Sequence, residues 1–571
     1  MNNIVYRQLR RSRRLFHRVH SAYQRAAQAL ASRWQLSKTP EFNKLLREIA
    51  SGEGIDRTEV LRYISQENLA ERLWTNLKLA EACYRTREYD QAKVFIRRVW
   101  LFSGLDEQYL PLFIAIHAAD NDVGPIREAH KALGIKKSQA GKTSEALKHF
   151  NDWQYAYAVH LKADDYRYDY EILDWISSLA KPHAFPARKS TPGFPNRKLR
   201  LAHLMFGMTH TNSVIVEISL LFAKYHDPSL FEVTFYVPEQ ASLIFSHQEA
   251  VNNINTIKSF GWNVVIAPNA ISEEQSLVDL SRTIYESEAD ILVTSAGLAD
   301  LKHYFITSLR PAPIVVGLCQ GPAPQYIAPD FTWSITWFRS LVLDCPVDCS
   351  FVNLRLDLPE RKYSREEAKS IFGIPKERLV FMTCGRPAKL QDLGFLKTLI
   401  DTVSSHPDAY LVVVGLGDLP TILREQLTPS IRERIKVFGW VTDFTKVLSM
   451  ADIVVDTYPS GGGVLIKDAA ALGTPVVSFK HDYMKTFSQK ECSAAEEVIG
   501  IPELLIERGD FVALNSILCR LLADHNYREY LSVLCKQRIN ETSGHSERMI
   551  KDCEEIYLEV ARKYALGTGL P

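Results

Sequence analysis

The stretch Ala451–Phe479 reads ADIVVDTYPSGGGVLIKDAAALGTPVVSF and changes its pattern several times within a short length. The β-branched run Ile453–Val455 is typical of a strand buried on both faces of a parallel sheet. Three glycines at Gly461–Gly463 follow, and Val464–Leu472 then has the composition of a helix. A glycine and a proline separate that helix from a second apolar run, Val476–Phe479. The stretch therefore predicts a strand, a glycine turn, a helix and a second strand.

The three glycines predict more than a tight turn. Glycine lets the backbone approach a ligand closely, and the start of the following helix offers N–H groups without intrahelical acceptors and the positive end of the helix dipole. These features together form a cradle for phosphate groups. Asp468 lies about one and a half turns into the helix, where a carboxylate could reach a ribose. The alternative interpretation is a glycine turn that only joins a strand to a helix.

Four segments of the chain resemble segments of one enzyme family. The glycine stretch resembles the nucleotide-sugar motif of glycosyltransferases with two facing Rossmann-like domains. LRPAPI at Leu309–Ile314, TCGRPAKLQDLGFL at Thr383–Leu396 and IGIPELLI at Ile499–Ile506 match further segments of the family. The resemblance starts at about Lys198 and is closest to the O-GlcNAc transferase (SPINDLY-like) family and the bacterial cytoplasmic N-glucosyltransferases.

The predicted fold class is α/β, with two facing Rossmann-like domains (the GT-B arrangement) preceded by an all-α N-terminal domain. Apolar strands that alternate with helices also indicate parallel α/β sheets, independently of the resemblance. The expected parts are a basic N-terminal helix at 1–40, an all-helical and partly tetratricopeptide-like domain at 41–180, a first Rossmann-like domain on the acceptor side at 198–345, a second on the nucleotide-sugar side at 375–510, and C-terminal helices at 511–571.

Two local predictions accompany this division. LWTNLKLAEACYRTREYDQAKVFIRRVW at Leu73–Trp100 predicts one helix pair, since apolar residues recur at helical spacing on both sides of a short turn. In the resembled family such helical domains present the protein acceptor, and the alternative role is a stabilising appendage. In the first α/β part, one continuous helix is expected from about Ala241 to Phe260.

The resemblance implies how a sugar diphosphate would be held. Lys389 matches the lysine that meets the phosphates, and Arg386 is close enough in sequence to share or take this role. Backbone N–H groups at Gly462–Leu465 would supply further donors. No pair of aspartates with the spacing of a magnesium site stands out, since Asp418 and Asp443 are isolated. We therefore expect a metal-independent site without a cofactor, in which the donor substrate is a UDP-sugar.

Two further positions would contact the nucleoside. Asp468 matches the family's ribose carboxylate, and its alternative role is a charge on a helix surface. The turn that contains Trp440 and Val441 should border the base through backbone groups, with a buried Trp440 as the alternative.

On the acceptor side, the loop GMTHTNS follows the first strand of the first α/β part. Its His210 is the candidate catalytic base, although a lone histidine is more often structural. Asn212 or Gln320 could hold sugar hydroxyls. The predicted site residues are His210 as catalytic residue and Arg386, Lys389, Trp440, Val441, Gly461, Gly462, Gly463, Val464, Leu465, Asp468 and Gln320 for the donor, with no metal ligand.

The glycine stretch also bears on stereochemistry. Where the O-GlcNAc branch has His-Thr-Thr after its glycine, this chain has Gly463, Val464 and Leu465, so only main-chain contacts to phosphate remain there. The retaining relatives have two glutamates around this loop, whereas Lys467 and Asp468 are the only charges here. This difference favours an inverting reaction.

Composition excludes several other classes of protein. With 46% hydrophobic and 24% charged residues and a net charge of +1, the chain is typical of a globular protein and not of a nucleic-acid binder. Its nine cysteines lack zinc-site spacing and indicate free thiols in a reducing compartment. No apolar run reaches the about 20 residues of a membrane span, and no secretory signal is evident, so a cytoplasmic location is expected.

The first 40 residues contain nine Lys/Arg and no Asp/Glu. Residues 1–30 could therefore form a basic amphipathic helix that contacts an anionic membrane, at the inner face of a bilayer. The alternatives are a solvated terminal helix or one that packs on an acidic patch of the protein.

The favoured hypothesis is an inverting, metal-independent glycosyltransferase that transfers GlcNAc or Glc from a UDP-sugar to a protein side chain. The alternatives are a glycosyltransferase that acts on a glycolipid or polysaccharide at the membrane surface, or a non-catalytic scaffold with a nucleotide-sugar fold. The expected partners are a UDP-sugar and a protein acceptor, without nucleic acid.

Overall fold

In the computed structural model, the described residues are 69–119, 122–160, 169–188, 196–209, 213–319, 327–337, 339–342, 345–390, 392–459, 461–480 and 494–565. The chain divides into two compact units, Met1–His160 and Leu161–Pro571. The predicted basic helix at 1–40 lies outside the described residues. Within the described part, no helix combines the length and the apolar composition needed to cross a bilayer.

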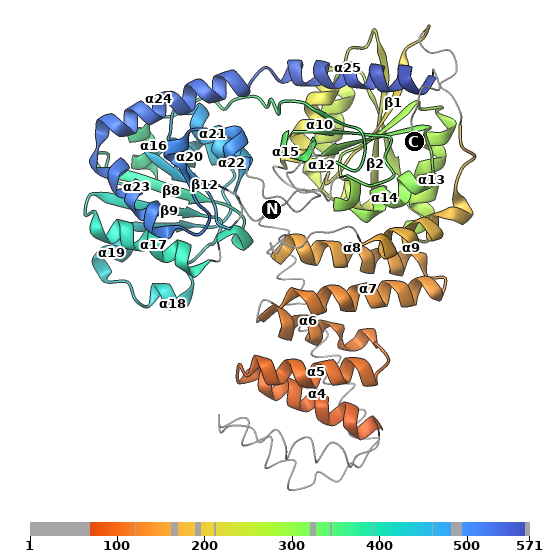
Figure 1. Cartoon of the computed structure of the whole chain (residues 1–571), viewed down its shortest axis with the longest axis horizontal. Helices are drawn as coiled ribbons and strands as arrows, with labels where there is room; N and C mark the ends of the chain where they lie inside the picture. Colours follow the sequence, from red (N-terminus) through yellow and green to blue (C-terminus); the bar gives the residue numbers. More distant parts are fainter. Residues whose placement is uncertain are drawn as a thin grey trace. The chain divides into compact units, whose positions relative to one another are not determined.

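The first unit is a stack of helices in which each helix packs on the next one in sequence (Figure 1). Apolar residues at helical spacing bury one face of each helix, and Phe95 and Ile96 are almost completely buried in the shared core. The predicted pair at Leu73–Trp100 falls on the first two helices. The helices are α4 (Leu69–Arg85), α5 (Tyr89–Phe102), α6 (Leu110–Ala119), α7 (Val123–Gln139) and α8 (Thr143–His160).

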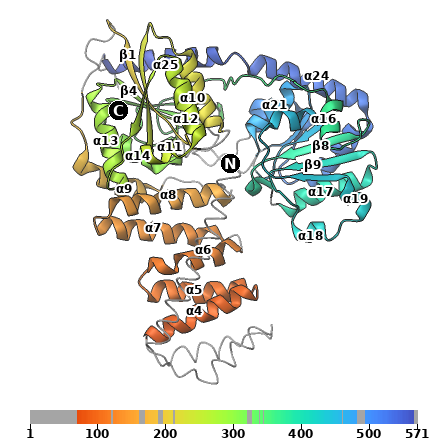
Figure 2. The same ribbon diagram turned by 180° about the vertical axis from the view of Figure 1, so that it is seen from behind.

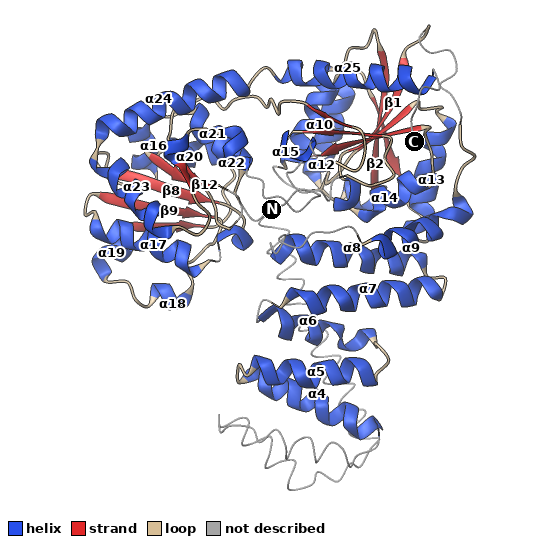
Figure 3. Ribbon diagram, viewed as in Figure 1, coloured by secondary structure: helices blue, strands red, loops and turns tan. Residues whose placement is uncertain are grey.

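The first described helix of the second unit is α9 (Tyr170–Ala180). A seven-stranded sheet follows, with the strand order β3-β2-β1-β4-β5-β6-β7. All neighbouring strands are parallel, and helices surround the sheet (Figure 3). The strands are β1 (Leu199–Leu204), β2 (Phe231–Gln240), β3 (Asn263–Ala267), β4 (Ile291–Thr294), β5 (Ile314–Cys319), β6 (Trp333–Thr336) and β7 (Cys349–Phe351). The helices are α10 (Val214–Tyr225), α11 (Ala241–Phe245), α12 (Gln248–Ser259), α13 (Glu273–Glu286), α14 (Leu301–Ser308) and α15 (Arg339–Val342).

A second sheet of six parallel strands follows in the order β10-β9-β8-β11-β12-β13. Its strands are β8 (Leu379–Cys384), β9 (Ala409–Val414), β10 (Ile435–Phe438), β11 (Ile453–Val455), β12 (Val476–Phe479) and β13 (Leu505–Ile506). Its helices are α16 (Arg365–Ile371), α17 (Leu393–Ser405), α18 (Thr421–Arg424), α19 (Pro429–Glu433), α20 (Phe444–Ser449), α21 (Gly463–Ala471) and α22 (Ala494–Val498).

The C-terminal helices divide between the two sheets. Apolar side chains of α23 (Phe511–Ala523) and α24 (His525–Thr542) join the core of the second sheet. By contrast, α25 (Ser546–Ala565) packs on α10 and buries Tyr557 completely in the core of the first sheet (Figures 1 and 2). The segment predicted as C-terminal helices at 511–571 therefore contributes to both cores.

The predicted α/β fold class, with helices before two parallel sheets, is confirmed by this architecture. One local prediction was wrong, because the helix expected from Ala241 to Phe260 is broken into α11 and α12. At the break, the hydroxyl of Ser246 donates to the carbonyl of Leu243 at 2.7 Å, and the N–H of His247 donates to the carbonyl of Ile244. These local hydrogen bonds replace those of a continuous helix.

Candidate functional site

The strand order of the second sheet defines where a ligand is expected. The chain runs outward from β8 through β9 to β10, returns to β11 beside β8, and continues to the other edge. In such doubly wound sheets ligands bind at the carboxyl ends of the strands where the order reverses. Here these strands are β8 and β11. Lys389 lies in the short turn after β8, and the glycine loop follows β11.

Asp456, the first residue after β11, holds the glycine loop in place. Its Oδ1 accepts the N–H groups of Thr457 and Gly462, both at 2.8 Å. Its Oδ2 accepts the hydroxyl of Ser478 in β12 at 2.6 Å. Burial raises the pKa of the Asp456 carboxyl, while these hydrogen bonds and the charge of Lys389 oppose the rise. Asp456 thus connects the glycine loop to β11, which precedes the loop, and to β12, which follows α21.

Lys389 lies against the same loop. Its Nζ donates to the carbonyl oxygen of Gly461, and its side chain is partly buried. The ends of β8 and β11 approach closely, since a Cβ at Gly385 would lie 2.6 Å from the Thr457 methyl group. Glycine at position 385 therefore allows the turn that contains Lys389 to lie next to the glycine loop.

The first turn of α21 offers backbone donors, but fewer than expected. The N–H of Gly462 already donates to Asp456, so the N–H groups of Gly463, Val464 and Leu465 remain at the helix start, where no intrahelical acceptor exists. A Cβ at Gly463 would meet no described atom within 4 Å. The space in front of this amide is therefore open on the side of the missing side chain.

Trp440 and Val441 follow β10 as expected from their sequence position. Val441 packs partly buried against the core of the second sheet. The indole Nε1 of Trp440 is buried and has no acceptor among the described residues. An indole N–H in this situation costs free energy unless a ligand or water accepts it. Trp440 therefore combines features of both interpretations, a partly buried ring and an N–H that is available to a ligand.

Asp468 has an ionic partner within the protein. Its Oδ1 lies 3.1 Å from the Nζ of buried Lys467, which also donates to the carbonyl of Asp357 at 3.2 Å. Burial raises the pKa of Asp468, and the Lys467 charge opposes this rise. Asp468 thus forms an ion pair within its own helix, as the alternative interpretation predicts. Its carboxylate is only partly buried and keeps some contact with solvent.

Three other predicted residues are less well placed by the structure. Arg386 is exposed and lies in the same turn, three residues before Lys389. The backbone N–H of Lys389 donates to the carbonyl of Arg386. His210 and Gln320 both lie outside the described residues.

The first sheet has its own reversal point, between β1 and β4, and polar groups lie near the carboxyl ends of its strands. Glu239, at the end of β2, has a buried Oε2 without a partner among the described residues, and burial raises the pKa of this carboxyl to about 7. The Nδ1 atom of His303, in α14, lies 2.9 Å from the hydroxyl oxygen of Thr294, at the end of β4. Burial lowers the pKa of His303 to about 4, so its ring is neutral at pH 7.

Glu239, His303 and Asp456 were not among the predicted site residues. Asp456 carried a usable signal, because it is the first polar residue after a buried strand and precedes the glycines. Glu239 likewise lies at the end of a strand, two residues after its apolar run ends at Val237. The role of His303 depends on packing between α14 and β4, for which the sequence offers no pattern.

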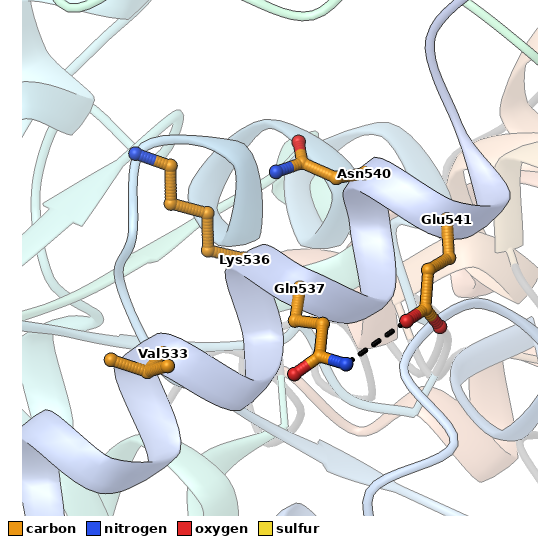
Figure 4. Close-up of a pocket in the computed structure, with 5 residues that line it drawn as sticks. All are labelled: Val533, Lys536, Gln537, Asn540 and Glu541. Carbon is orange, nitrogen blue, oxygen red and sulfur yellow. Dashed lines mark hydrogen bonds between the residues drawn. The ribbon is translucent and has the colours of Figure 1, made fainter.

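Two hollows lie near these elements. A small one is lined by residues behind the glycine loop: Asp456, Thr457, Pro459, Gly461, Ser478, Phe479 and Ala495. A wider one is lined only by residues of α24: Val533, Lys536, Gln537, Asn540 and Glu541 (Figure 4). The wider hollow lies near Gly473, beyond the opposite end of α21 from the glycine loop. Because all its lining residues come from one helix, we assign it no role in the site.

Comparison with known proteins identifies the second sheet. Residues 378–524 match the family model described as glycosyl transferases group 1. This range includes Lys389, Asp456 and the glycine loop. The chain therefore carries a group 1 glycosyltransferase domain. The two strands at the reversal point, β8 and β11, both belong to this domain.

Two relatives share part of the sequence. A UDP-N-acetylglucosamine–peptide N-acetylglucosaminyltransferase of Giardia intestinalis is 24% identical over 208 residues, which are 35% of this chain and 13% of that protein. A GDP-mannose-dependent monoacylated alpha-(1-6)-phosphatidylinositol monomannoside mannosyltransferase of Corynebacterium glutamicum is 28% identical over 140 residues, which are 24% of this chain and 36% of that protein. The matches thus span much less than two thirds of either relative.

A solved structure supports the fold. A mutant O-GlcNAc transferase of Thermobaculum terrenum superposes with a TM-score of 0.53 at 14% identity, over 88% of this chain and 100% of that chain. The predicted resemblance to glycosyltransferases with the GT-B fold is confirmed by this structure together with the family model.

Proposed function

We propose that this protein transfers a sugar from a UDP-sugar, with GlcNAc or Glc as the sugar, to a side chain of an acceptor protein. The observation that carries the proposal is the meeting of Lys389 with the glycine loop at the reversal point of the glycosyltransferase domain. A cation and a set of backbone N–H groups at this position suit the diphosphate of a nucleotide sugar.

The proposed reaction breaks the bond between C1 of the sugar and the β-phosphate oxygen. The acceptor oxygen or nitrogen forms a new bond to C1, loses its proton to a base, and UDP leaves with the electron pair of the broken bond. Lys389 and the N–H groups of Gly463–Leu465 would stabilise the charge that develops on the diphosphate. In this proposal they act without a metal ion, and attack from the opposite face inverts C1.

The base would come from the first sheet. His210 is the candidate from the sequence, and Glu239, at the end of β2, is a second candidate from the described residues. With a pKa of about 7, Glu239 can accept a proton near neutral pH. Asp468 is proposed to contact the ribose, a role that would require its carboxylate to exchange or share its contact with Lys467.

The protein acceptor rests on one relative. The Giardia protein is named for transfer to a peptide, although the match covers only a small part of it. The helical first unit is proposed to present the acceptor, with a tetratricopeptide-like arrangement of its helix pairs.

A second candidate function has its own support. The Corynebacterium relative is named for a lipid acceptor and a GDP-mannose donor. The basic segment 1–40 would suit a protein that works at an anionic membrane surface at the cytoplasmic face. In this case the donor and the acceptor would both differ from those of the first proposal.

A donor screen followed by an acceptor assay separates these functions. Thermal unfolding of the full chain is measured with UDP, GDP, UDP-GlcNAc, UDP-Glc and GDP-mannose, since a ligand of the folded state raises the midpoint. The first proposal predicts stabilisation by UDP and one UDP-sugar, and mass increases of one sugar residue on co-expressed proteins. Stabilisation by GDP-mannose alone would favour the lipid candidate, and no stabilisation by any nucleotide would favour a non-catalytic scaffold.

Metal independence and stereochemistry have separate readouts. Added Mg²⁺ or Mn²⁺ is expected to leave the transfer rate unchanged, since Lys389 and the backbone amides stabilise the leaving group. NMR of the product anomeric proton is expected to show inversion at C1. A rate that depends on added Mg²⁺, or a retained configuration, would contradict that part of the proposal.

A further inference from the structure

Two buried histidines face each other in the first unit. His130 lies on α7 and His149 on α8, and these helices pack side by side (Figure 1). The Nδ1 atoms of the two rings are 3.3 Å apart. Asp152 lies one helical turn after His149, and its Oδ2 is 3.8 Å from Nδ1 of His130. One ligand atom from each of these three residues lies within 4.8 Å of the other two.

The spacing of these atoms matches that of ligands around one small ion. In a tetrahedral zinc site the His nitrogens lie about 2.0–2.1 Å from the metal, which places two such nitrogens about 3.3 Å apart. The two Nδ1 atoms already have this separation. The Asp152 side chain is 42% exposed, so the site is open to solvent on one side, where water could complete the coordination.

A second carboxylate, that of Glu107, contacts the other ring nitrogen of His149. Its Nε2 lies 3.3 Å from Oε1 of Glu107, and Oε2 of Glu107 lies 2.7 Å from the Nζ of Lys137. With Nε2 beside Glu107, the Nδ1 atom of His149 lies on the other side of the ring, 3.3 Å from Nδ1 of His130. This arrangement of carboxylate, histidine and ion is the usual support for a metal-ligating histidine.

A competing arrangement needs no metal, since one Nδ1–H can donate to the other Nδ1 across the same 3.3 Å.

We propose that His130, His149 and Asp152 form a binding site for a divalent transition metal of the zinc type, with Glu107 as the residue that positions His149. The ion would link α7 to α8 and stabilise the first unit. This proposal is independent of the glycosyltransferase site, which lies in the other unit. It was not accessible from cysteine and histidine spacing, because its ligands come from two helices.

The test uses the full chain after treatment with a chelator and dialysis. Zn²⁺ binding is measured by calorimetry, and Co²⁺ is added as a spectroscopic probe whose visible absorption reports nitrogen and oxygen ligands. The wild-type chain is expected to bind one more equivalent of Zn²⁺ than His149→Ala, and its thermal midpoint is expected to rise with Zn²⁺.

Asp152→Asn provides a second test in case His149→Ala does not fold. The Asp152 side chain is half-exposed, so this substitution does not open the core. Zn²⁺ affinity is expected to fall at least tenfold in this variant, with an unchanged midpoint in the absence of metal. His117→Asn, a buried histidine of α6 outside the cluster, and Asp90→Asn, an exposed carboxylate of α5, are matched controls that should keep the site. Equal stoichiometry and affinity in the wild type, His149→Ala and Asp152→Asn would overturn the proposal.

Discussion

Lys389 reaches the carbonyl of Gly461 across 72 residues of chain, and this contact exists only in the folded sheet. At the scale of single residues, the donor site depends on such contacts between loops that follow neighbouring strands. Lys389 and Gly463 are both only partly buried, so each can be changed without removing a core side chain.

Replacement of Lys389 should reduce transfer more than it reduces stability. For Lys389→Ala we expect kcat/KM to fall by about 10²–10³-fold, because a charge that stabilises the leaving diphosphate is lost. Initial rates with the donor identified by the screen measure this effect. Lys397→Ala, an exposed lysine of α17 paired with Asp401, is the control and should keep full activity. A loss of less than threefold in Lys389→Ala would remove Lys389 from the donor site.

Gly463→Ala tests whether the open space at the start of α21 is occupied by the donor. The new methyl group meets no described protein atom, and alanine favours the helix, so the unfolding midpoint should stay the same or rise. A phosphate held against this amide would collide with the methyl group, so UDP affinity measured by calorimetry should fall at least tenfold. Gly124→Ala, which also adds a methyl group to open space at the start of a helix, should leave UDP affinity unchanged. Unaltered UDP affinity in Gly463→Ala would show that the ligand lies elsewhere.

Glu239→Gln should change the pH dependence of both activity and stability. The pKa of this carboxyl is about 7 in the folded protein against an ordinary 4.5, so between these values the folded state binds more protons than the unfolded state. The contribution of Glu239 to the free energy of unfolding therefore falls as pH rises from about 4.5 to 7. Glu239→Gln should lose this decline, and kcat/KM should lose its rise through about pH 7.

The measurement is the difference in unfolding free energy between wild type and Glu239→Gln at several pH values. Glu554, whose pKa is also raised to about 7, is present in both proteins and its effect cancels in the difference. A difference that stays constant from pH 4.5 to 7 would contradict the raised pKa of Glu239.

The sequence indicated some of these residues better than others. Lys389 and the glycines could be selected because they lie in a recognisable order after short strands. The use of the Gly462 N–H by Asp456 could not, since it depends on the exact path of the loop between β11 and α21. The burial of the Glu239 Oε2, which has no partner among the described residues, likewise depends on the folded structure and not on a local sequence pattern.

At the scale of elements, Asp456 holds the glycine loop between β11 and α21 in place. Asp456→Ala would leave two N–H groups and one hydroxyl without their acceptor, so we expect the free energy of unfolding to fall by about 2–3 kcal/mol. Denaturant unfolding measures this loss, and UDP affinity should decrease with it. Ser478→Ala removes only one of the three hydrogen bonds and should cost about 1 kcal/mol. Equal losses in the two variants would show that Asp456 does not hold the loop.

Element prediction succeeded where hydrophobic runs were continuous and bounded by glycine or proline. β11, α21 and β12 all fall within the stretch Ala451–Phe479 that predicted them. The break between α11 and α12 escaped prediction because Ser246 and His247 are compatible with a helix in composition. β6 and β7 are short and lie among polar residues, so they lacked a clear pattern of their own.

At the scale of the whole molecule, removal of residues 1–40 distinguishes the two candidate functions. If the acceptor is a protein, the truncated chain should transfer sugar at a rate within about twofold of the full chain. If the acceptor is a lipid, truncation removes nine basic residues and should abolish binding to vesicles that contain anionic lipid. Vesicle cosedimentation and transfer assays on the same preparations measure both outcomes. Unchanged vesicle binding after truncation would exclude the basic segment as a membrane contact.

The overall class of fold was accessible from sequence because alternation of strands and helices persists over hundreds of residues. The division of the last helices between two cores did not follow from their own patterns, since α23, α24 and α25 are all amphipathic and such a pattern does not indicate which sheet a helix covers.

The attachment of α25 to the first sheet affects how the protein can be synthesised. Glu554 of α25 contacts His226 at 2.8 Å, and these residues are 328 positions apart. While the ribosome is still translating the second sheet, the surface of α10 that α25 will cover remains exposed to water. The earlier of the two sheets is thus completed only when translation has passed Ala561, and until then it presents an apolar face that a chaperone can bind.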